Sequence, residues 1–165
     1  MIILNTPNNP LGKVFTRLEL EVIAKLCKRY NVLCLADEVY EWTVFKPKKH
    51  IRIASLPGMW RRTITVGSAG KTFSVTGWKT GWAYAPAALM TNLQVVHQNC
   101  VYTCNTPIQE ALARSFEIEL ARRDTCECFF KVLAKSLLAK RDCMVQVLRE
   151  SGFNPIVPDG GYFII

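Results

Sequence analysis

Two lysines that could take part in chemistry lie close together in the sequence, between residues 68 and 82. Small residues around them leave room for a ligand. Lys71 sits on a glycine-bounded turn directly after Thr63–Val66, an apolar run of β-branched residues that predicts a buried strand. Lys79 stands eight positions later, between two glycines. Ligands of α/β sheets bind near strand ends, on turns of this kind. The stretch is therefore our first candidate site, for a bulky anionic ligand.

Three other interpretations compete for this stretch. The simplest is a structural turn with two solvated lysines. A phosphate-binding P-loop would end in the Gly-Lys-Thr found at 70–72, but Thr65 stands where that motif needs its first glycine. A serine acyl-transfer site would use the Ser-x-x-Lys of 68–71 and the Lys-Thr-Gly of 79–81, but those motifs belong on well-separated elements, and no Ser-Asp-Asn occurs.

A carboxylate is the second candidate group. The run 32–36 predicts a strand that ends at Asp37, with Tyr40 three residues later. A carboxylate at the end of a buried strand is costly unless a cation meets it. The structural alternative is that Asp37 caps a helix. Upstream, residues 5–13 hold two prolines and three asparagines, which predict a rigid loop rich in hydrogen-bonding groups.

The elements that would position these groups alternate between strands and helices. Thr16 opens a helix with Glu19 in a capping box. We expect the face of that helix that packs on the sheet to be the stripe Leu18, Val22, Leu26 and Tyr30. Residues 46–62 are polar, and we expect them to form an irregular segment at the surface. The alternation predicts an α/β fold, a three-layer αβα sandwich with a mostly parallel sheet.

The second half of the chain predicts one strand and three helices. The strand is 81–84, and helices follow from Pro86 and from a cap at Thr106. A long helix over 129–149 ends before Gly152. Its apolar stripe comprises Phe130, Leu133, Leu137, Met144 and Leu148.

Composition narrows the protein class. The chain has 165 residues, half of them hydrophobic, which is enough for one domain with a good core. No run of eighteen apolar residues occurs, so we expect no membrane span. The start lacks a signal-peptide pattern, so we expect a protein that is not secreted. The sequence begins at Met1 and ends at 161–165 within apolar runs that are typical of strands. This suggests a piece of a longer protein.

The cysteine content and the net charge argue against a disulfide-bonded protein, a metal-binding protein and a nucleic-acid-binding protein. Seven cysteines without a secretory signal indicate reduced thiols, and those at 27 and 34 fit apolar core positions. His50 and His97 form no convincing ligand set with them, so we expect no metal site. The formal charge is +8, with a basic cluster at 46–52. No stacking aromatics interleave that cluster, so we expect a solvated surface and no nucleic-acid partner.

Four motifs taken together resemble a known family, the fold type I aminotransferases that depend on pyridoxal 5'-phosphate (PLP). The sequences of these motifs most resemble those of the kynurenine aminotransferases, also known as cysteine-S-conjugate β-lyases. The matching residues are Asn9-Pro10-Leu11-Gly12, Asp37-Glu38-Val39-Tyr40-Glu41, Ser68-Ala69-Gly70-Lys71-Thr72-Phe73 and Gly77-Trp78-Lys79-x-Gly81-Trp82. The likeness covers nearly the whole chain.

The resemblance assigns roles residue by residue. Lys71 would hold the cofactor as a Schiff base and then move the proton at the substrate Cα. Asp37 would pair with the pyridinium nitrogen of PLP. Tyr40 and Asn9 would hydrogen-bond its phenolic oxygen, with Asn9 also near the substrate carboxylate. A last pair would bind the phosphate, namely Ser68 and Lys79; many relatives carry arginine in place of that lysine.

The resemblance also implies a function and an organisation. Residues 1–147 would belong to the PLP-binding large domain, and 148–165 would begin a smaller C-terminal α+β domain. The parent protein would be a cytoplasmic or mitochondrial homodimer that transfers an amino group between L-kynurenine, or glutamine, and a 2-oxo acid. Cysteine-S-conjugate β-elimination, another aromatic or glutamine transamination, or a catalytically inert binding piece are the alternatives. Because the substrate-carboxylate arginine and partner-subunit residues lie outside the chain, we expect these 165 residues alone to be inert.

Overall fold

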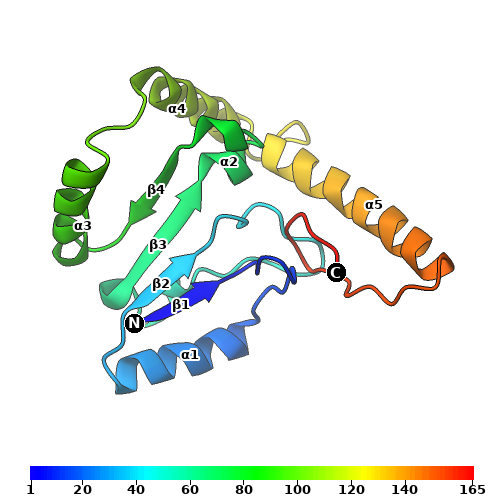
Figure 1. The fold of residues 1–165 in the computed structure, drawn as a ribbon, viewed down its shortest axis with the longest axis horizontal. Helices are drawn as coiled ribbons and strands as arrows, with labels where there is room; N and C mark the ends of the chain where they lie inside the picture. Colours follow the sequence, from blue (N-terminus) through cyan, green and yellow to red (C-terminus); the bar gives the residue numbers. More distant parts are fainter.

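A four-stranded sheet forms the centre of the molecule in the computed structural model, which describes all of residues 1–165 (Figure 1). Its strands lie in the order β1-β2-β3-β4. The first three are parallel, and β4 runs antiparallel to β3. The predicted mostly parallel sheet is thereby confirmed. The strands are β1 (Ile2–Asn5), β2 (Cys34–Asp37), β3 (Thr63–Ser68) and β4 (Gly81–Tyr84).

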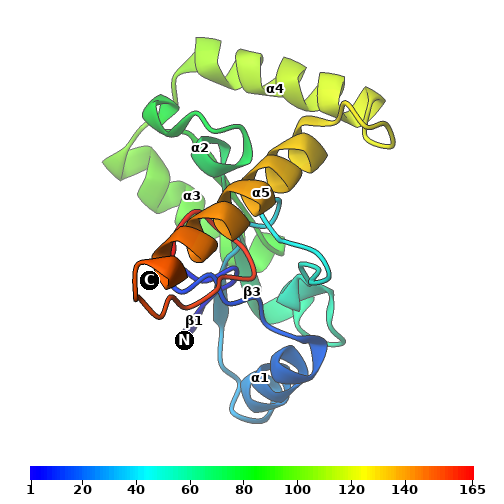
Figure 2. The same ribbon diagram turned by 90° about the vertical axis from the view of Figure 1, so that its right-hand side faces the viewer.

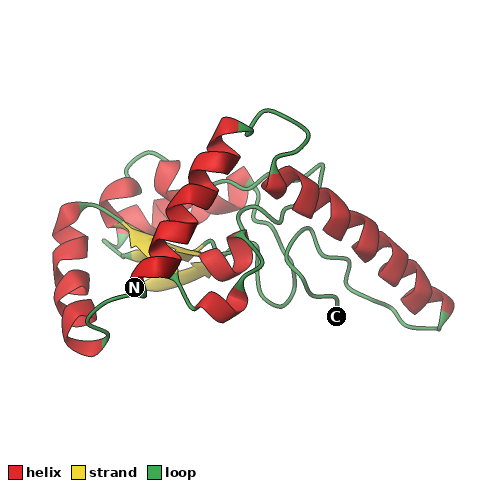
Figure 3. Ribbon diagram, turned by 90° about the horizontal axis from the view of Figure 1, so that it is seen from above, coloured by secondary structure: helices red, strands yellow, loops and turns green.

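Helices surround the sheet, and α1 packs its buried side chains on one face of β1 and β2, as expected for an α/β fold. Helix α1 lies beside β1 and β2, α3 lies beside β4, and α5 extends away from the sheet (Figures 1 and 3). No helix is both long and apolar enough to span a membrane. The helices are α1 (Arg17–Arg29), α2 (Ala69–Thr72), α3 (Ala87–Cys100), α4 (Thr106–Ala121) and α5 (Phe129–Glu150), with 3₁₀ turns η1 (Ile53–Ser55), η2 (Trp60–Arg62) and η3 (Thr76–Trp78).

The core lies between α1, the strands β1 and β2, and the segment 53–59. Complete burial of a leucine or methionine side chain there contributes roughly 1.5–3 kcal/mol. Both cysteines predicted to act as small hydrophobes belong to this core, and all seven thiols are free. The buried cluster comprises Leu4, Leu20, Ala24, Cys27, Cys34, Ala36, Ile53, Leu56 and Met59.

Helix α1 begins as predicted but turns a different face to the sheet. The Thr16 hydroxyl accepts from the Glu19 amide at 3.3 Å, and the Glu19 carboxylate accepts from the Thr16 amide at 2.8 Å, which completes the capping box. The predicted packing stripe is wrong, because Leu18 is 75% exposed and its companions are exposed too. The buried face carries Leu20, Ala24 and Cys27. Its small residues let the helix approach the sheet closely.

The segment 46–62 is only partly the surface excursion we predicted. Its second half packs into the core, where Ile53 and Met59 are fully buried. Arg62 is also buried, and its guanidinium donates to the Cys27 carbonyl at 3.3 Å and to the Asn31 side-chain oxygen at 3.0 Å. The apolar residues are interspersed with basic residues, a proline and a glycine, so composition alone pointed to the surface.

Helix boundaries were predicted well, and details at their ends differ. Asn105, not Thr106, caps α4, because its side-chain oxygen accepts from the Ile108 amide. In α5, Met144 is 51% exposed, and Val145 is the buried residue of that turn. The predicted strand at 161–165 does not form, and the nearest strand-like pairing is an isolated bridge between Gly160 and Val44.

Candidate active site

The ends of three strands bring the predicted groups to one edge of the sheet. The register pairs Asn5 with Asp37, and Asp37 with Val66, so β1, β2 and β3 finish side by side. The last residue of β3, Ser68, pairs with the first residue of the antiparallel strand β4. Carboxyl ends of parallel strands are the usual ligand-binding edge of an α/β sheet.

Lys71 lies in the short helix α2 that follows β3, and its amine faces two aromatic rings. The Nζ atom lies 5.7 Å from the centroid of the Tyr40 ring and 6.0 Å from that of the Tyr162 ring. The two rings meet edge to face at 5.3 Å. Cations over aromatic faces within about 6 Å are stabilised electrostatically. Tyr40 and Tyr162 therefore hold the amine in a defined place.

Tyr40 is suited to remain protonated near neutral pH. It is buried, and burial raises the pKa of its phenol; the nearby Tyr162 and Asp37 raise this pKa further. Burial disfavours the charged phenolate, and a neighbouring negative charge does the same. The Tyr40 hydroxyl is therefore available to donate a hydrogen bond to a ligand oxygen.

Asp37 ends β2 with a half-buried carboxylate. Its Oδ1 accepts one long hydrogen bond, 3.4 Å from the Val39 amide. No helix begins at Asp37, so the alternative that it caps a helix is wrong. Its backbone carbonyl accepts from the Asn5 side chain at 3.2 Å and from the Thr6 amide at 3.1 Å. Most of the hydrogen-bonding capacity of the carboxylate is thus left for a cationic partner.

Asn9 lies on the exposed loop after β1, held by a residue that our sequence analysis did not select. The Asn9 amide donates to Oδ1 of Asn5 at 2.6 Å, while Nδ2 of Asn5 donates to the carbonyl of Asp37. Asn5 therefore links the loop to the end of β2. The signal that could have identified Asn5 is its position as the polar residue that ends the apolar run 2–4.

Ser68 and Lys79 lie at the same sheet edge without a contact between them. Ser68 pairs with Gly81, and Lys79 stands two residues before that glycine, at the end of η3. Lys79 has a left-handed backbone, with φ of 51°, and its side chain is exposed. Neither side chain forms a hydrogen bond or an ion pair within the chain.

Tyr162 is a second residue that our sequence analysis did not assign to the site. Its hydroxyl donates to the backbone carbonyl of Lys71 at 2.9 Å, across 91 positions of sequence. The segment around it is held by main-chain bonds, including one from the Gly161 amide to the carbonyl of Thr43 at 2.8 Å. The C-terminal segment and the loop after β1 lie side by side in Figures 1 and 2. An aromatic residue after paired glycines was the available signal.

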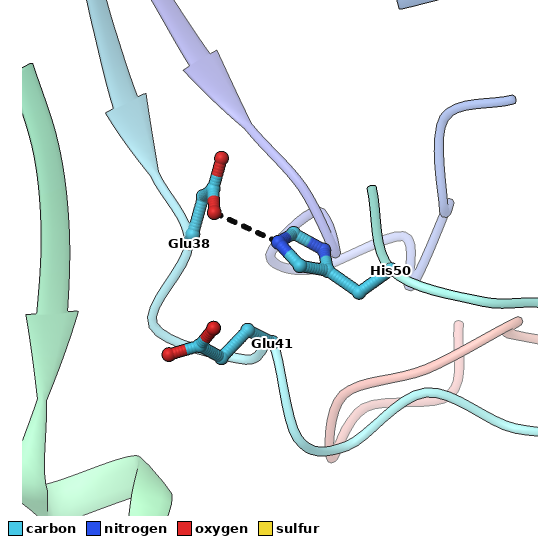
Figure 4. Close-up of side chains that lie close together, drawn as sticks. All are labelled: Glu38, Glu41 and His50. Atoms are coloured by element: carbon cyan, nitrogen blue, oxygen red, sulfur yellow. Dashed lines mark hydrogen bonds and ion pairs between the residues drawn. The ribbon is translucent and has the colours of Figure 1, made fainter. Parts of the chain in front are cut away.

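Beside the site, a buried acid makes a network of its own. Glu38 is 1% exposed, and its Oε2 lies 2.8 Å from His50 Nε2 (Figure 4). Arg52 lies 3.8 Å from the same oxygen and pairs with Glu41. Ligand atoms of Glu38, Glu41 and His50 lie within 4.8 Å of one another, as in a metal site. The Arg52 guanidinium already balances both carboxylates, however, so the arrangement is an ion-pair network.

A cavity of about 630 Å³ opens elsewhere and contains none of the predicted residues. Its lining is mainly aromatic, with Arg52 and Glu41 at one side. The candidate site therefore rests on the strand ends around Lys71, where the chemical groups converge, and not on this hollow. The aromatic lining comprises Trp42, Trp60, Trp82, Tyr84 and Phe116.

Comparison with known sequences identifies the family. The profile of the family "Aminotransferase class I and II" matches residues 1–165. The chain belongs to this family. The chain is 62% identical over 164 residues to kynurenine–oxoglutarate transaminase 3 of Homo sapiens, and 50% identical over 165 residues to kynurenine–oxoglutarate transaminase 1 of Mus musculus. The matches cover 99% and 100% of this chain, and it spans 36% and 39% of the length of those relatives.

Solved structures agree with the family assignment. Bna3p from Saccharomyces cerevisiae superposes with a TM-score of 0.91 at 36% identity, covering 98% of this chain and 37% of that one. The N-succinyldiaminopimelate aminotransferase from Mycobacterium tuberculosis gives 0.87 at 38% identity, covering 97% and 40%. The four-stranded mixed sheet of this chain is thus part of the α/β fold found in solved aminotransferases, as the sequence predicted.

Proposed function

We propose that the parent protein of this chain is a PLP-dependent aminotransferase that moves an amino group between L-kynurenine, or glutamine, and a 2-oxo acid. The observation that carries the proposal is the placement of the Lys71 amine against the ring of Tyr40, a tyrosine whose phenol is close enough to the carboxylate at the end of β2 for Asp37 to raise its pKa. The names of the relatives point to kynurenine and oxoglutarate as substrates. Amino-acid and 2-oxo-acid substrates both carry carboxylates, which suit a basic chain.

The donor set around Lys71 fits PLP in charge and chemistry. Each part of PLP has a matching group. The amine suits its aldehyde, and the acid suits its pyridine nitrogen. The protonated phenol suits its phenolic oxygen, and the serine with the lysine suits its phosphate. Bound PLP supplies an electron sink for the bond that breaks at the substrate Cα. Lys71 would hold the cofactor covalently, and Asp37 would pair with its ring nitrogen.

The remaining residues would orient the cofactor and the substrate. Tyr40 would donate to the phenolic oxygen, since its raised pKa keeps the proton on the phenol. Asn9 would bind the same oxygen and lie near the substrate carboxylate. Ser68 and Lys79 would bind the phosphate, because both lie at the sheet edge with unengaged side chains. Lys79 would act there as a point charge, without the bidentate geometry of an arginine.

Lys71 would also move the proton. Once its amine is released, Nζ would take the proton from the substrate Cα, the general-base step of the reaction. The two tyrosine rings restrict where the amine can lie, which favours a geometry close to reaction. We place residues 1–147 in the cofactor-binding domain and 148–165 at the start of a smaller domain, and we propose a homodimer for the parent protein.

The test is reduction of the parent protein with borohydride in the presence of PLP, followed by peptide mass mapping. We expect the reduced cofactor on Lys71, a visible absorbance band that borohydride removes, and loss of both in Lys71→Ala. Transfer of the amino group from L-kynurenine and glutamine to oxoglutarate measures activity. A cysteine S-conjugate in the same assay reports the alternative β-elimination.

The matched control is Lys25→Ala, because Lys25 is an exposed lysine of helix α1, remote in sequence from the sheet edge. It should keep both the band and the activity. A parent protein in which borohydride labels no residue, or labels a lysine other than Lys71, contradicts the proposal. Salt-sensitive nucleic-acid binding without the band would favour the non-catalytic alternative instead.

A further inference from the structure

Tyr162 connects the C-terminal segment to the turn that carries Lys71. Its hydroxyl donates to the Lys71 carbonyl at 2.9 Å, and its ring faces the Lys71 amine at 6.0 Å. One side chain therefore contacts both ends of the lysine, its backbone and its amine. The ring also meets Tyr40 edge to face, so the two tyrosines form adjoining walls around Nζ.

The turn that Tyr162 contacts is short, and its local hydrogen bonds come from residues close to it in sequence, such as the one from the Ala69 amide to the Thr80 carbonyl at 3.0 Å. Helix α2 holds only four residues, and the side chain of its N-cap residue, Ser68, makes no capping hydrogen bond. Ser74, just beyond it, adopts a left-handed backbone with φ of 57°, a conformation that costs energy for a residue with a side chain. The Ser74 hydroxyl also lies near the Tyr162 phenol, where it opposes the rise in the pKa of Tyr162 caused by burial. The hydroxyl of Tyr162 thus adds a long-range anchor at Lys71 to the local bonds of this turn, in which the Thr76 hydroxyl donates to the Gly70 carbonyl at 3.1 Å.

The segment that carries Tyr162 is itself fixed to the site loops. The Asp159 amide donates to the carbonyl of Gly12 at 2.9 Å, and the Phe45 amide donates to the carbonyl of Asp159 at 2.8 Å. Arg141 of α5 donates to the carbonyl of Pro158 at 2.9 Å. Gly12 has φ of +68°, and a Cβ there would lie 2.2 Å from the Cβ of Pro158, so the two loops are in close contact. The segment is therefore a rigid support.

We propose that Tyr162 is a positioning residue for Lys71, which fixes the amine for proton transfer at the substrate Cα. The inference rests on the proposed function, because it assigns Tyr162 to the proton step of Lys71. Tyr162 acts through the lysine and the carbonyl that it bonds. Its effect should therefore fall on the chemical step and not on substrate binding.

The decisive variant is Tyr162→Phe in the full-length parent protein, since it keeps the ring and removes only the hydroxyl. We expect kcat to fall about fivefold, the effect of one neutral hydrogen bond, with little change in KM for the amino donor. The deuterium isotope effect with a Cα-deuterated amino donor should rise, because proton transfer becomes more rate-limiting. A merely structural role of Tyr162 would leave that isotope effect unchanged.

A second readout does not depend on turnover. In apo-protein mixed with PLP and cyanoborohydride, which reduces the imine and spares the free aldehyde, the rate of labelling at Lys71 should fall in Tyr162→Phe and fall further in Tyr162→Leu, which also removes the ring. Circular dichroism verifies that each variant is folded. The matched control is Tyr30→Phe, because Tyr30 is 62% exposed on α1 and its hydroxyl has no partner.

The outcomes separate the two proposals. Labelled Lys71 in the wild type, with unchanged kcat, isotope effect and labelling rate in Tyr162→Phe, overturns the role of Tyr162 and leaves the proposed function standing. Absence of label on Lys71 in the wild type overturns the proposed function and this inference with it. An equal loss in Tyr30→Phe would likewise overturn the assignment to Tyr162.

Discussion

At the scale of single residues, the site divides into groups left open for a ligand and groups bound within the chain. Asp37 and Lys79 have spare hydrogen-bonding capacity at the surface of the sheet edge. Glu38, one position after Asp37, is instead buried; its Oε2 pairs with His50 and lies 3.8 Å from Arg52, whereas its Oε1 has no hydrogen-bond partner. Side chains alternate across a strand end, so neighbouring acids face opposite environments. One acid is thus free for chemistry, and the other holds the turn that carries Tyr40.

His50→Ala should destabilise the parent protein by about 3 kcal/mol, because it leaves the buried carboxylate of Glu38 with only Arg52 at 3.8 Å. Urea denaturation measures the free energy of unfolding. The control Glu110→Ala removes an exposed pair with Arg114 and should change that energy by about 0.5 kcal/mol at most. Equal effects of the two variants would show that Arg52 alone satisfies Glu38.

At the scale of elements, the sequence predicts where helices and strands lie better than which face they bury. Periodicity located α1 and α5, and the capping box located the start of α1 at Thr16. The packing face of α1 was missed because the helix carries two apolar stripes, and periodicity does not rank them. Tyr162 was missed as a site residue because its contact with Lys71 spans the chain, and no local pattern encodes it. The strand ends were predicted, since polar residues directly follow buried apolar runs.

The capping box of α1 should give a pH signature. The hydrogen bond from Lys13, then those from the Thr16 amide and hydroxyl, lower the pKa of Glu19 from 4.5 to about 2. The lowered folded-state pKa means that this carboxylate stabilises the protein above pH 4.5 and loses that contribution as pH falls toward 2. NMR titration of the Glu19 carboxyl should show a midpoint near 2, moving upward in Lys13→Ala.

Comparison of stabilities provides a second measurement of the same effect. The difference in unfolding free energy between the wild type and Glu19→Gln should shrink steadily as the pH is lowered from 4.5 to 2, where the Glu19 carboxyl takes up its proton. A midpoint near 4.5 in the wild type would contradict the bonded geometry at the start of α1.

At the scale of the whole molecule, the chain exposes more surface than its mass predicts. Its accessible surface is 10530 Å² for 18.7 kDa. A compact monomer of that mass would expose roughly 8,300 Å². Helix α3 buries none of its residues, and large apolar side chains such as Leu18 and Val96 are exposed. The chain spans 36% of the length of its human relative, so we propose that the rest of the parent protein covers these faces.

The 165-residue chain on its own should therefore bind a hydrophobic dye strongly and show no transamination, whereas the parent protein should bind little dye and be active. Exposed apolar faces and the unpaired outer edges of β1 and β4 make the isolated chain prone to association. The measurements are dye fluorescence and amino transfer from L-kynurenine, at equal molar concentrations of chain and parent. Supplying PLP should not restore activity to the isolated chain, because orientation of the substrate needs groups beyond those at this sheet edge. An isolated chain that transaminates would show that the strand ends around Lys71 suffice for catalysis.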